Sequence, residues 1–269
     1  MNHYRVSRAV HPLVFIFLFL KGQAQTVRPL YAGTKTPYVQ PQQKYTAPPK
    51  GFHAVFVNYV GRHGARFMTK SGADRQALEM LEEADREHAL SDTGRLIKRS
   101  VEKMLSIQKT GYEKITLLGA MEQTAIGERI YDHYQTAFSG RGIKVQYTFK
   151  TRTQQSAEAF LMAYRKYPGI ITTEKNTDSA NTELRFYDLS PAYTNYKNGS
   201  DIRRSLDSLN ADPTEEQMVK RVCLKLFTIS YAEHLISDRK ASRIVENLYD
   251  LYTATFAVKN EMKDRGFTT

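Results

Sequence analysis

The sequence has 269 residues, of which 41% are hydrophobic and 11% aromatic, and this composition excludes a globally disordered chain because it can supply a packed core. Its 39 lysine and arginine residues outnumber 28 aspartate and glutamate residues, which gives a formal net charge of +11. A basic excess of this size favours anionic partners, such as nucleic acid, an acidic membrane surface or phosphorylated small molecules, although many basic proteins use the excess only for solubility.

Residues 1–24 have the composition of a secretory signal peptide. A basic beginning is followed by an apolar run at residues 12–20 (PLVFIFLFL), which is too short for a bilayer because spanning takes about 20 apolar residues. Gly22 and Ala24 are small residues at the spacing of a cleavage site. We therefore expect cleavage after Ala24, a periplasmic or secreted protein, and no stable membrane span after cleavage. The alternative interpretation of the same run is an N-terminal membrane anchor.

Residues 25–50 are rich in proline, glutamine and threonine, which predicts an extended lead-in rather than a regular element. Residues 53–60 (HAVFVNYV) then combine alternation with β-branched and aromatic residues, so we expect a buried strand. Residues 61–69 (GRHGARFMT) form the sharp exit from that strand.

The next part of the chain alternates between helical and strand patterns. Residues 73–88 form a charged amphipathic helix pattern, and Asp92 is the expected N-cap of a second helix. The buried stripe of this second helix is expected at Leu96, Ile97, Val101, Met104 and Leu105. Residues 122–138 predict a further helix. Residues 143–149 (IKVQYTF) alternate as a strand does, and residues 156–164 (SAEAFLMAY) predict an apolar helix after it.

The remainder of the chain is predominantly helical in pattern. Residues 184–189 (LRFYDL) predict a short strand or extended piece, and from Asp201 onward the sequence reads almost entirely as helix. Two apolar stripes are expected to be buried, the first at Met218, Val222, Leu226 and Ile229 and the second at Ile244, Leu248, Leu251, Tyr252 and Phe256. Strands that alternate with helices predict an α/β core, and the helical tail predicts an added α-helical domain.

These patterns predict four segments along the chain. Residues 1–24 are the signal peptide and residues 25–50 the lead-in. Residues 51–195 form a partial α/β core, and residues 196–269 form an incomplete α-helical domain.

Residues 62–66 (RHGAR) are the most informative stretch, because they directly follow the predicted strand and ligands of α/β sheets bind beyond the carboxyl ends of strands. The imidazole of His63 can attack a phosphorus atom there. The guanidinium groups of Arg62 and Arg66 can grip phosphate oxygens and stabilise the charge that develops. Gly64 allows the backbone to turn tightly. The alternative is a chance tripeptide on a basic surface, and the position after a strand together with the second arginine favours a phosphate site.

Residues 61–69 resemble the R-H-G-x-R-x-P-T signature of the histidine acid phosphatases, with Met68 at the place of the proline. Residues 118–123 (LGAMEQ) resemble the helix that packs beside the nucleophile loop in this family. Residues 149–161 (FKTRTQQSAEAFL) resemble its second landmark, a strand end that bears an arginine before a helix. The resemblance implies that Arg152 is the third arginine that clamps the phosphate.

Two further segments narrow the resemblance within the superfamily. Residues 33–38 (GTKTPY) and 184–188 (LRFYD) are similar to pieces typical of the multiple inositol polyphosphate phosphatases. The resemblance covers roughly residues 30–260, and the combination of segments is more specific than any one of them. A phosphoglycerate mutase-like enzyme and a general acid phosphatase are the alternatives within the superfamily.

The resemblance implies a three-layer histidine-phosphatase-like α/β core and a two-step reaction that needs no metal and no cofactor. His63 would attack a phosphate monoester and form a phosphohistidine, which water then hydrolyses. Arg62, Arg66 and Arg152 would bind the transferring group. The expected partner is a small anionic phosphorylated substrate, an inositol polyphosphate such as phytate, and this choice agrees with the basic charge.

Members of this family take the proton for the leaving group from a later His-Asp or His-Ala-Glu motif, which this sequence does not show. General acid help is typically worth about 10²–10⁴-fold in rate. His234 precedes a leucine in a helical pattern and His133 also lies in a helical pattern, so both are expected to be surface or helix-packing residues. We therefore expect the chain to be truncated relative to the family. The alternative function is a catalytically incomplete phosphate-binding relative or fragment.

A nucleic-acid-binding module is disfavoured for two reasons. The signal peptide predicts export, and the basic residues are interspersed with acidic ones rather than clustered in a stripe.

Overall fold

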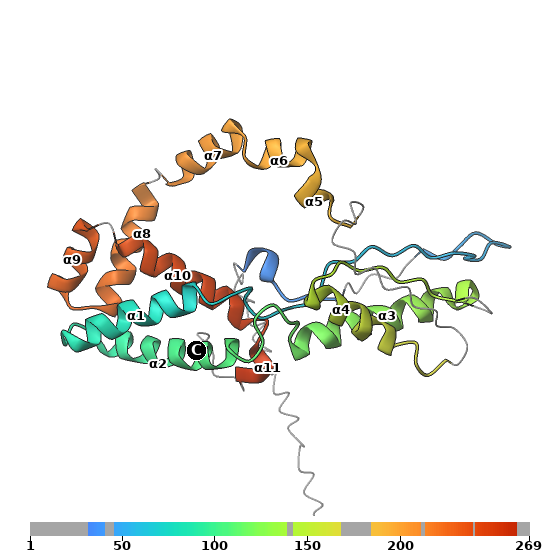
Figure 1. Cartoon of the computed structure of the whole chain (residues 1–269), viewed down its shortest axis with the longest axis horizontal. Helices are drawn as coiled ribbons and strands as arrows, with labels where there is room; N and C mark the ends of the chain where they lie inside the picture. Colours follow the sequence, from blue (N-terminus) through green and yellow to red (C-terminus); the bar gives the residue numbers. More distant parts are fainter. Residues whose placement is uncertain are drawn as a thin grey trace, which may run out of the picture. The chain divides into compact units, whose positions relative to one another are not determined.

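The structure is a computed structural model of the chain, and its elements are shown in Figure 1. It describes residues 32–40, 46–138, 142–167, 184–210, 213–238 and 240–262. The predicted signal peptide at residues 1–24 lies outside the described residues. Of the predicted lead-in, residues 32–40 and 46–50 are described, and they contain one short 3₁₀ helix, η1 (Gly33–Lys35).

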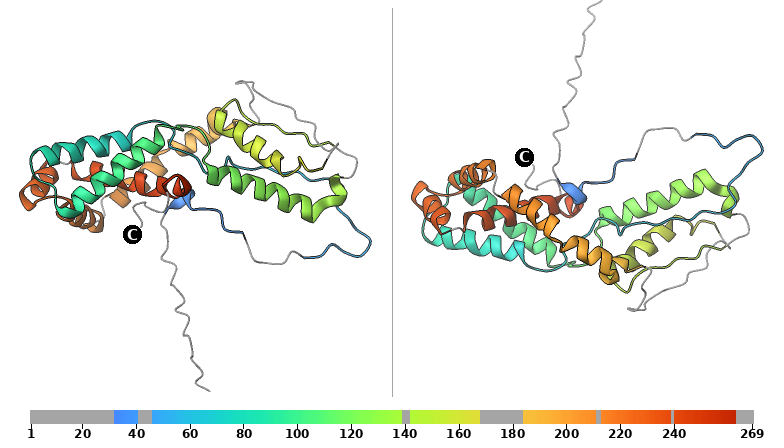
Figure 2. Two further views of the ribbon diagram at one scale, coloured as in Figure 1. Left: turned by 90° about the horizontal axis from the view of Figure 1, so that it is seen from below. Right: turned by 90° about the horizontal axis from the view of Figure 1, so that it is seen from above.

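The main hydrophobic core lies among five amphipathic helices: α1 (Ala73–Arg86), α2 (Asp92–Gln108), α8 (Pro213–Leu226), α9 (Ile229–Ser237) and α10 (Ala241–Thr255). Figure 2 shows from two further sides that α1, α2 and α10 lie together. The fully buried side chains of this core include Leu81, Val101, Met104, Cys223, Ile244 and Leu251. Each helix contributes residues three, four or seven positions apart, so that one face of the helix is apolar and buried.

This packing joins segments that the sequence assigned to two domains. Helices α1 and α2 come from the predicted core at residues 51–195, whereas α8 to α10 come from the predicted helical domain at residues 196–269, and α1 packs along α10. All described residues belong to one compact unit. The boundary between residues 195 and 196 stays a prediction.

Ser91 is the N-cap of α2, and its extended backbone places the side-chain oxygen so that it accepts a hydrogen bond from the Gly94 N–H at 3.0 Å. The prediction that Asp92 caps the helix is therefore wrong by one residue, because Asp92 is already the first helical residue. The backbone N–H of Ser91 also donates to the carbonyl of Leu226 at 2.9 Å. This bond ties the beginning of α2 to the end of α8.

A second pair of helices consists of α3 (Leu117–Phe138) and α4 (Thr151–Met162), which lie side by side in both Figure 1 and Figure 2. Both helices begin earlier than the sequence predicted, at residue 117 rather than 122 and at residue 151 rather than 156. The hydroxyl of Thr124 in α3 donates to the carbonyl of Ala159 in α4 at 2.8 Å. A small second hydrophobic core around Tyr164 lies near the C-terminal ends of the two helices.

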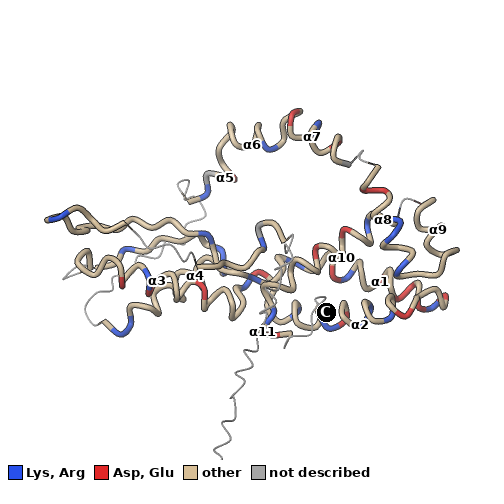
Figure 3. Tube along the Cα trace, turned by 180° about the vertical axis from the view of Figure 1, so that it is seen from behind, with Lys and Arg blue, Asp and Glu red and all other residues tan. Residues whose placement is uncertain are grey.

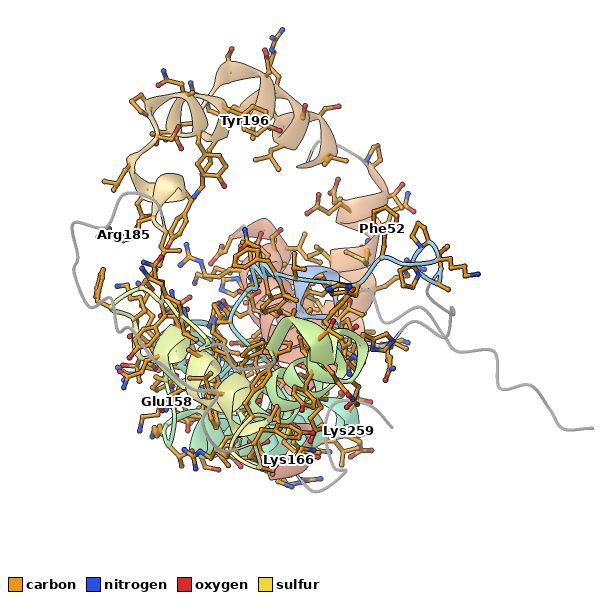
Figure 4. All side chains as sticks on the ribbon, turned by 90° about the vertical axis from the view of Figure 1, so that its right-hand side faces the viewer. Phe52, Glu158, Lys166, Arg185, Tyr196 and Lys259 are labelled. Carbon is orange, nitrogen blue, oxygen red and sulfur yellow. The ribbon has the colours of Figure 1, made fainter. Side chains whose placement is uncertain are left out.

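Residues 53–60 are extended but do not form the buried strand that the sequence predicts. Phe56 is 78% exposed and Val60 is 88% exposed, and Phe52, just before the segment, is labelled in Figure 4. These residues form no bridge, and the described part of the chain contains no strand. The prediction is wrong because a strand is held by hydrogen bonds to a neighbouring strand, and no described segment pairs with this one.

The second predicted strand, at residues 143–149, is also extended without forming a strand. The described residues pair through isolated bridges instead, among them Arg66 with Ile115 and Leu90 with Phe227. The described part of the protein therefore has the helices of the predicted α/β arrangement and lacks its sheet.

The segment predicted as a third strand, residues 184–189, contains a short helix, α5 (Phe186–Leu189). Arg185 forms an ion pair with Asp188 at 2.9 Å, and this spacing of three residues favours a helical turn over a strand. The strand prediction is wrong here for that local reason. Two more helices follow, α6 (Pro191–Lys197) and α7 (Ser200–Asn210).

The last helix is α11 (Lys259–Met262), and it is held against the earlier helices by polar contacts. The side chain of Glu261 accepts a hydrogen bond from the Leu117 N–H at 3.2 Å, at the beginning of α3. The ammonium group of Lys103 in α2 donates to the carbonyl of Met262 at 2.8 Å. None of the helices in the described residues is both long enough and apolar enough to cross a membrane.

Candidate active site

The loop that carries the Arg-His-Gly motif is fixed by backbone hydrogen bonds to the segment that precedes α3. The N–H of Phe67 donates to the carbonyl of Lys114 at 3.0 Å, and the N–H of Thr116 donates to the carbonyl of Ala65 at 2.9 Å. Arg66 and Ile115 form the antiparallel bridge between these two bonds. The loop is therefore positioned by backbone pairing, independently of the exposed segment at residues 53–60.

The first turn of α3 lies directly against this loop. Thr116 precedes the helix, and its side-chain oxygen accepts a hydrogen bond from the Gly119 N–H at 3.2 Å, as an N-cap does. A side chain at Gly64 would place its Cβ 2.5 Å from the carbonyl oxygen of Gly119, which no real Cβ tolerates. Both positions need glycine because two backbones meet here without room for a side chain between them.

Two polar side chains from α3 and α4 hold the backbone on either side of His63. The side-chain amide of Gln123 in α3 donates to the carbonyl of Arg62 at 3.1 Å. The N–H of Gly64 donates to the hydroxyl oxygen of Ser156 in α4 at 3.0 Å. Neither residue could be assigned a role from the sequence, because a polar residue on a helix carries no sequence signal of which loop it contacts.

His63 is partly buried, and its ring is oriented by its own loop. Its Nδ1 lies 2.9 Å from the carbonyl oxygen of Gly64. Because a carbonyl oxygen only accepts, Nδ1 carries the proton in this contact and Nε2 keeps its lone pair. Burial lowers the pKa of His63, the hydrogen bond to Gly64 opposes that shift, and the charges of Arg66, Arg152 and Arg62 lower the pKa further. These shifts favour the neutral form of the ring, which is the form that a nucleophile needs.

The four residues that the sequence predicted for the site lie close enough to act on one another. The guanidinium of Arg66 donates to the carbonyl of Phe67 at 2.8 Å. Burial lowers the pKa of Arg66, and the charges of Arg152 and Arg62 lower it further, against the opposing charge of Glu113. Like charges gathered around one imidazole repel one another, so the arrangement favours a bound anion.

Arg152 gives the most direct indication of what that anion contacts. It lies in the first turn of α4, and its Nε–H is buried without an acceptor among the described residues. A buried donor without a partner costs about 1–3 kcal/mol, and more when the group is charged. An oxygen of a phosphate group is an acceptor with the matching charge, and arginine binds such oxygens through two parallel hydrogen bonds.

The other histidines that the sequence analysis considered do not belong to this cluster. His133 is exposed on α3, and its Nδ1 lies 2.8 Å from the carbonyl of Arg129. His234 is exposed on α9 and lies 3.4 Å from a carboxylate oxygen of Asp238. Neither is among the groups that shift the pKa of His63. Within the described ranges, no group of three or more histidine, cysteine, aspartate or glutamate side chains is arranged to hold a metal ion.

Two hollows of about 250 and 270 Å³ lie elsewhere, along α1 and α9. Glu87, Tyr231 and His234 line both hollows, Glu83 of α1 lines the second only, and no residue of the arginine cluster lines either of them. The candidate site is therefore defined by its converging side chains rather than by a cavity.

A model of the histidine phosphatase superfamily (branch 2) matches residues 55–260, which is well over half of the chain. A comparison with curated proteins found no significant match.

Three similar solved structures are those of the multiple inositol polyphosphate phosphatase of Bifidobacterium longum: a complex with phosphate, a complex with inositol hexasulfate, and the apo form. Their TM-scores are 0.70, 0.67 and 0.69, and their sequence identities are 20%, 19% and 19%. Each match covers 87% of this chain and 62% of the other, so this chain spans less than two thirds of their length. At this identity the likeness shows the fold: it supports a histidine-phosphatase-like core, while the described residues form no sheet and the added helical domain stays a prediction.

Proposed function

Because the chain belongs to the histidine phosphatase superfamily, branch 2, we propose that it hydrolyses phosphate monoesters through a phosphohistidine at His63. One observation carries this proposal: the buried Nε–H of Arg152 has no acceptor among the described residues, beside an imidazole on which Arg62 and Arg66 also act. A phosphate group would accept from Arg152 and would offset the repulsion among the three guanidinium groups.

The reaction has two steps that share one phosphorus atom. In the first step Nε2 of His63 forms a bond to phosphorus while the bond between phosphorus and the alcohol oxygen breaks, and the departing oxygen takes up a proton. Arg62, Arg66 and Arg152 bind the other oxygens, whose charge they stabilise in the transition state. In the second step water attacks phosphorus, the N–P bond breaks, inorganic phosphate leaves and His63 returns to its neutral form.

Inositol polyphosphates are the substrates that we propose. The net charge of +11 favours a small molecule with many negative charges. The similar structures from B. longum are of an inositol polyphosphate phosphatase, one in complex with phosphate and one with inositol hexasulfate. We also propose export to the periplasm or the medium, on the basis of residues 1–24.

A second candidate is a phosphate-binding relative without turnover. The groups that act on His63 are three arginines and the backbone of Gly64, and no described carboxylate or second imidazole is among them. A site made of these groups alone would bind a phosphate ester without supplying a proton to the leaving oxygen. The charge pattern does not favour nucleic acid, because Figure 3 shows acidic residues beside basic ones along α1 and α2.

The test is phosphate release from phytate by the purified protein, together with His63→Ala and with Arg165→Ala. Arg165 is an exposed arginine just beyond α4, and its replacement is the control for a lost surface charge. Release by the wild type and by Arg165→Ala, but not by His63→Ala, together with an acid-labile phosphoenzyme, would support the phosphatase. Binding of inositol hexasulfate without release of phosphate from phytate would support the binding protein. Phosphate release that persists in His63→Ala would refute the assignment of His63 as the nucleophile.

A further inference from the structure

The hydroxyl of Ser156 joins two parts of the candidate site that are far apart in the sequence. Ser156 lies in α4 and is only 6% exposed. Its oxygen accepts a hydrogen bond from the Gly64 N–H at 3.0 Å, and its O–H donates to the carbonyl of Arg152 at 2.7 Å. One buried hydroxyl therefore contacts the peptide next to His63 and the backbone of the arginine with the unpaired Nε–H.

The contact reaches the imidazole through Gly64. The N–H of Gly64 is held by Ser156, and the carbonyl of the same residue accepts from Nδ1 of His63 at 2.9 Å. The position of the Gly64 backbone thus sets the direction in which the ring points. Since the Nδ1–H is bound in this way, the orientation of Nε2, the attacking atom, depends on a chain of hydrogen bonds that starts at Ser156.

An ordinary helix serine does not explain this arrangement. Serine in a helix often donates to the carbonyl four residues earlier, and Ser100 in α2 does so with Leu96 at 3.2 Å. Ser156 makes the same local bond and also accepts from a loop 92 residues away. Gly64 also lies in close contact with Gly119 of α3, so the loop contacts both α3 and the hydroxyl of Ser156 in α4.

We propose that Ser156 is a positioning residue, which holds the nucleophile His63 and the clamp residue Arg152 in fixed relation to each other. This inference rests on the proposed role of His63 as the nucleophile. Replacing Ser156 with alanine leaves the Gly64 N–H without its acceptor, and the loop loses its tie to α4. Threonine keeps the hydroxyl, so Ser156→Thr retains both hydrogen bonds.

The test compares Ser156→Ala, Ser156→Thr and the control Ser100→Ala in the full-length protein. The first readout is the ¹⁵N NMR spectrum of the His63 ring, which reports whether the proton sits on Nδ1. The second is the affinity for inorganic phosphate measured by calorimetry. Both can be measured without turnover, so they test the positioning role even if the protein hydrolyses no phytate.

We expect Ser156→Ala to lose the defined Nδ1–H form and to bind phosphate about three- to tenfold more weakly, as the loss of one net hydrogen bond predicts. Ser156→Thr and Ser100→Ala should resemble the wild type in both readouts. An unchanged ring tautomer with unchanged phosphate affinity in Ser156→Ala would overturn the inference. Equal losses in Ser156→Ala and Ser156→Thr would also overturn it, because they would indicate packing rather than the hydroxyl. Should Ser156→Ala not fold, Ser156→Cys, which keeps the volume with a weaker acceptor, takes its place with the same expectations.

Discussion

Gly119 lies so close to Ala65 that a side chain at residue 119 would place its Cβ 2.1 Å from the Ala65 carbonyl oxygen. Because that oxygen also accepts the backbone hydrogen bond from Thr116 at 2.9 Å, the loop cannot move away without losing a bond. We expect Gly119→Ala to lower the free energy of unfolding by about 1–3 kcal/mol, the usual cost of overpacking. It should also weaken phosphate binding, because the loop carries His63. Urea unfolding and calorimetry with inorganic phosphate measure the two effects.

The control for this variant is Ala125→Gly, in the middle of the same helix. It lowers helix stability by about 1 kcal/mol without adding an atom near the loop. Its phosphate affinity should equal that of the wild type. If Gly119→Ala bound phosphate with the same affinity as the wild type, this would contradict the idea that the close contact fixes the position of the loop.

Arg152 should matter for anion binding and not for stability. We expect Arg152→Gln to weaken the binding of inositol hexasulfate by about tenfold or more, because a hydrogen bond to a charged group is worth about 1.5–3 kcal/mol. Without ligand the same variant should be at least as stable as the wild type, since it removes a buried unpaired donor and one of three repelling charges. Calorimetry and thermal unfolding give the two values.

Arg152→Lys separates charge from geometry. Lysine keeps the positive charge but lacks the planar fork of guanidinium, so we expect intermediate affinity. Arg165→Ala is the surface control and should bind as the wild type does. An Arg152→Gln protein that binds inositol hexasulfate with wild-type affinity would remove Arg152 from the site.

The stability of the protein should depend on pH through His63. Burial, together with the charges of Arg66, Arg152 and Arg62, lowers the pKa of His63 in the folded state below its ordinary value of about 6.5. The unfolded chain therefore binds a proton more readily than the folded one. The lowered pKa of His63 therefore reduces the free energy of unfolding by its full amount when the pH is below the folded pKa. This destabilisation disappears as the pH rises above about 6.5. We expect His63→Gln to lose less stability than the wild type between pH 7.5 and pH 5, as measured by urea unfolding.

A bound anion should reverse this shift. Phosphate offsets the charges of the arginines, so the pKa of His63 should rise when phosphate is added, and an NMR titration of the ring with and without phosphate measures the change. A pKa that stays the same or falls on addition of phosphate would show that the anion does not bind beside the imidazole.

Local periodicity predicted the helices well because it depends on near neighbours in the sequence. Val101 and Met104 in α2 and Ile244 and Leu251 in α10 are fully buried, as the stripes predicted. Leu96, also expected in the buried stripe of α2, is 57% exposed, so the prediction is wrong for this residue. The stripe expected at Met218, Val222, Leu226 and Ile229 was only partly right: Leu226 is buried, whereas Met218 is 44% exposed and Ile229, the first residue of α9, is 68% exposed. The other buried residues of α8 are Val219 and Cys223, each one position after a predicted residue. Adjacent positions on a helix differ by about 100°, so tertiary contacts decide which of two apolar edges turns inward.

The candidate site was only partly accessible from the sequence. Arg62, His63 and Arg66 could be proposed as site residues because they stand together in one short motif whose side chains suit phosphate chemistry. Arg152 could be proposed only from the resemblance to the family. The contacts made by Gln123 and Ser156 could not be predicted, because they cross 61 and 92 residues of sequence. Strand pairing is non-local in the same way, which is why an alternating pattern alone did not produce a sheet.

The exposed segment at residues 53–60 gives a last prediction, since two aromatic residues in it differ in environment. Tyr59 stacks on Phe160 of α4 with ring centroids 5.3 Å apart and an interplanar angle of 6°, whereas Phe56 is 78% exposed. We expect Tyr59→Ala to lower the free energy of unfolding by about 0.5–1.5 kcal/mol, the usual contribution of an aromatic pair. Phe56→Ser should change it by less than about 0.5 kcal/mol, as for most surface substitutions. Urea unfolding of both variants gives the comparison, and a large loss in Phe56→Ser would show that the segment is buried as the sequence had predicted.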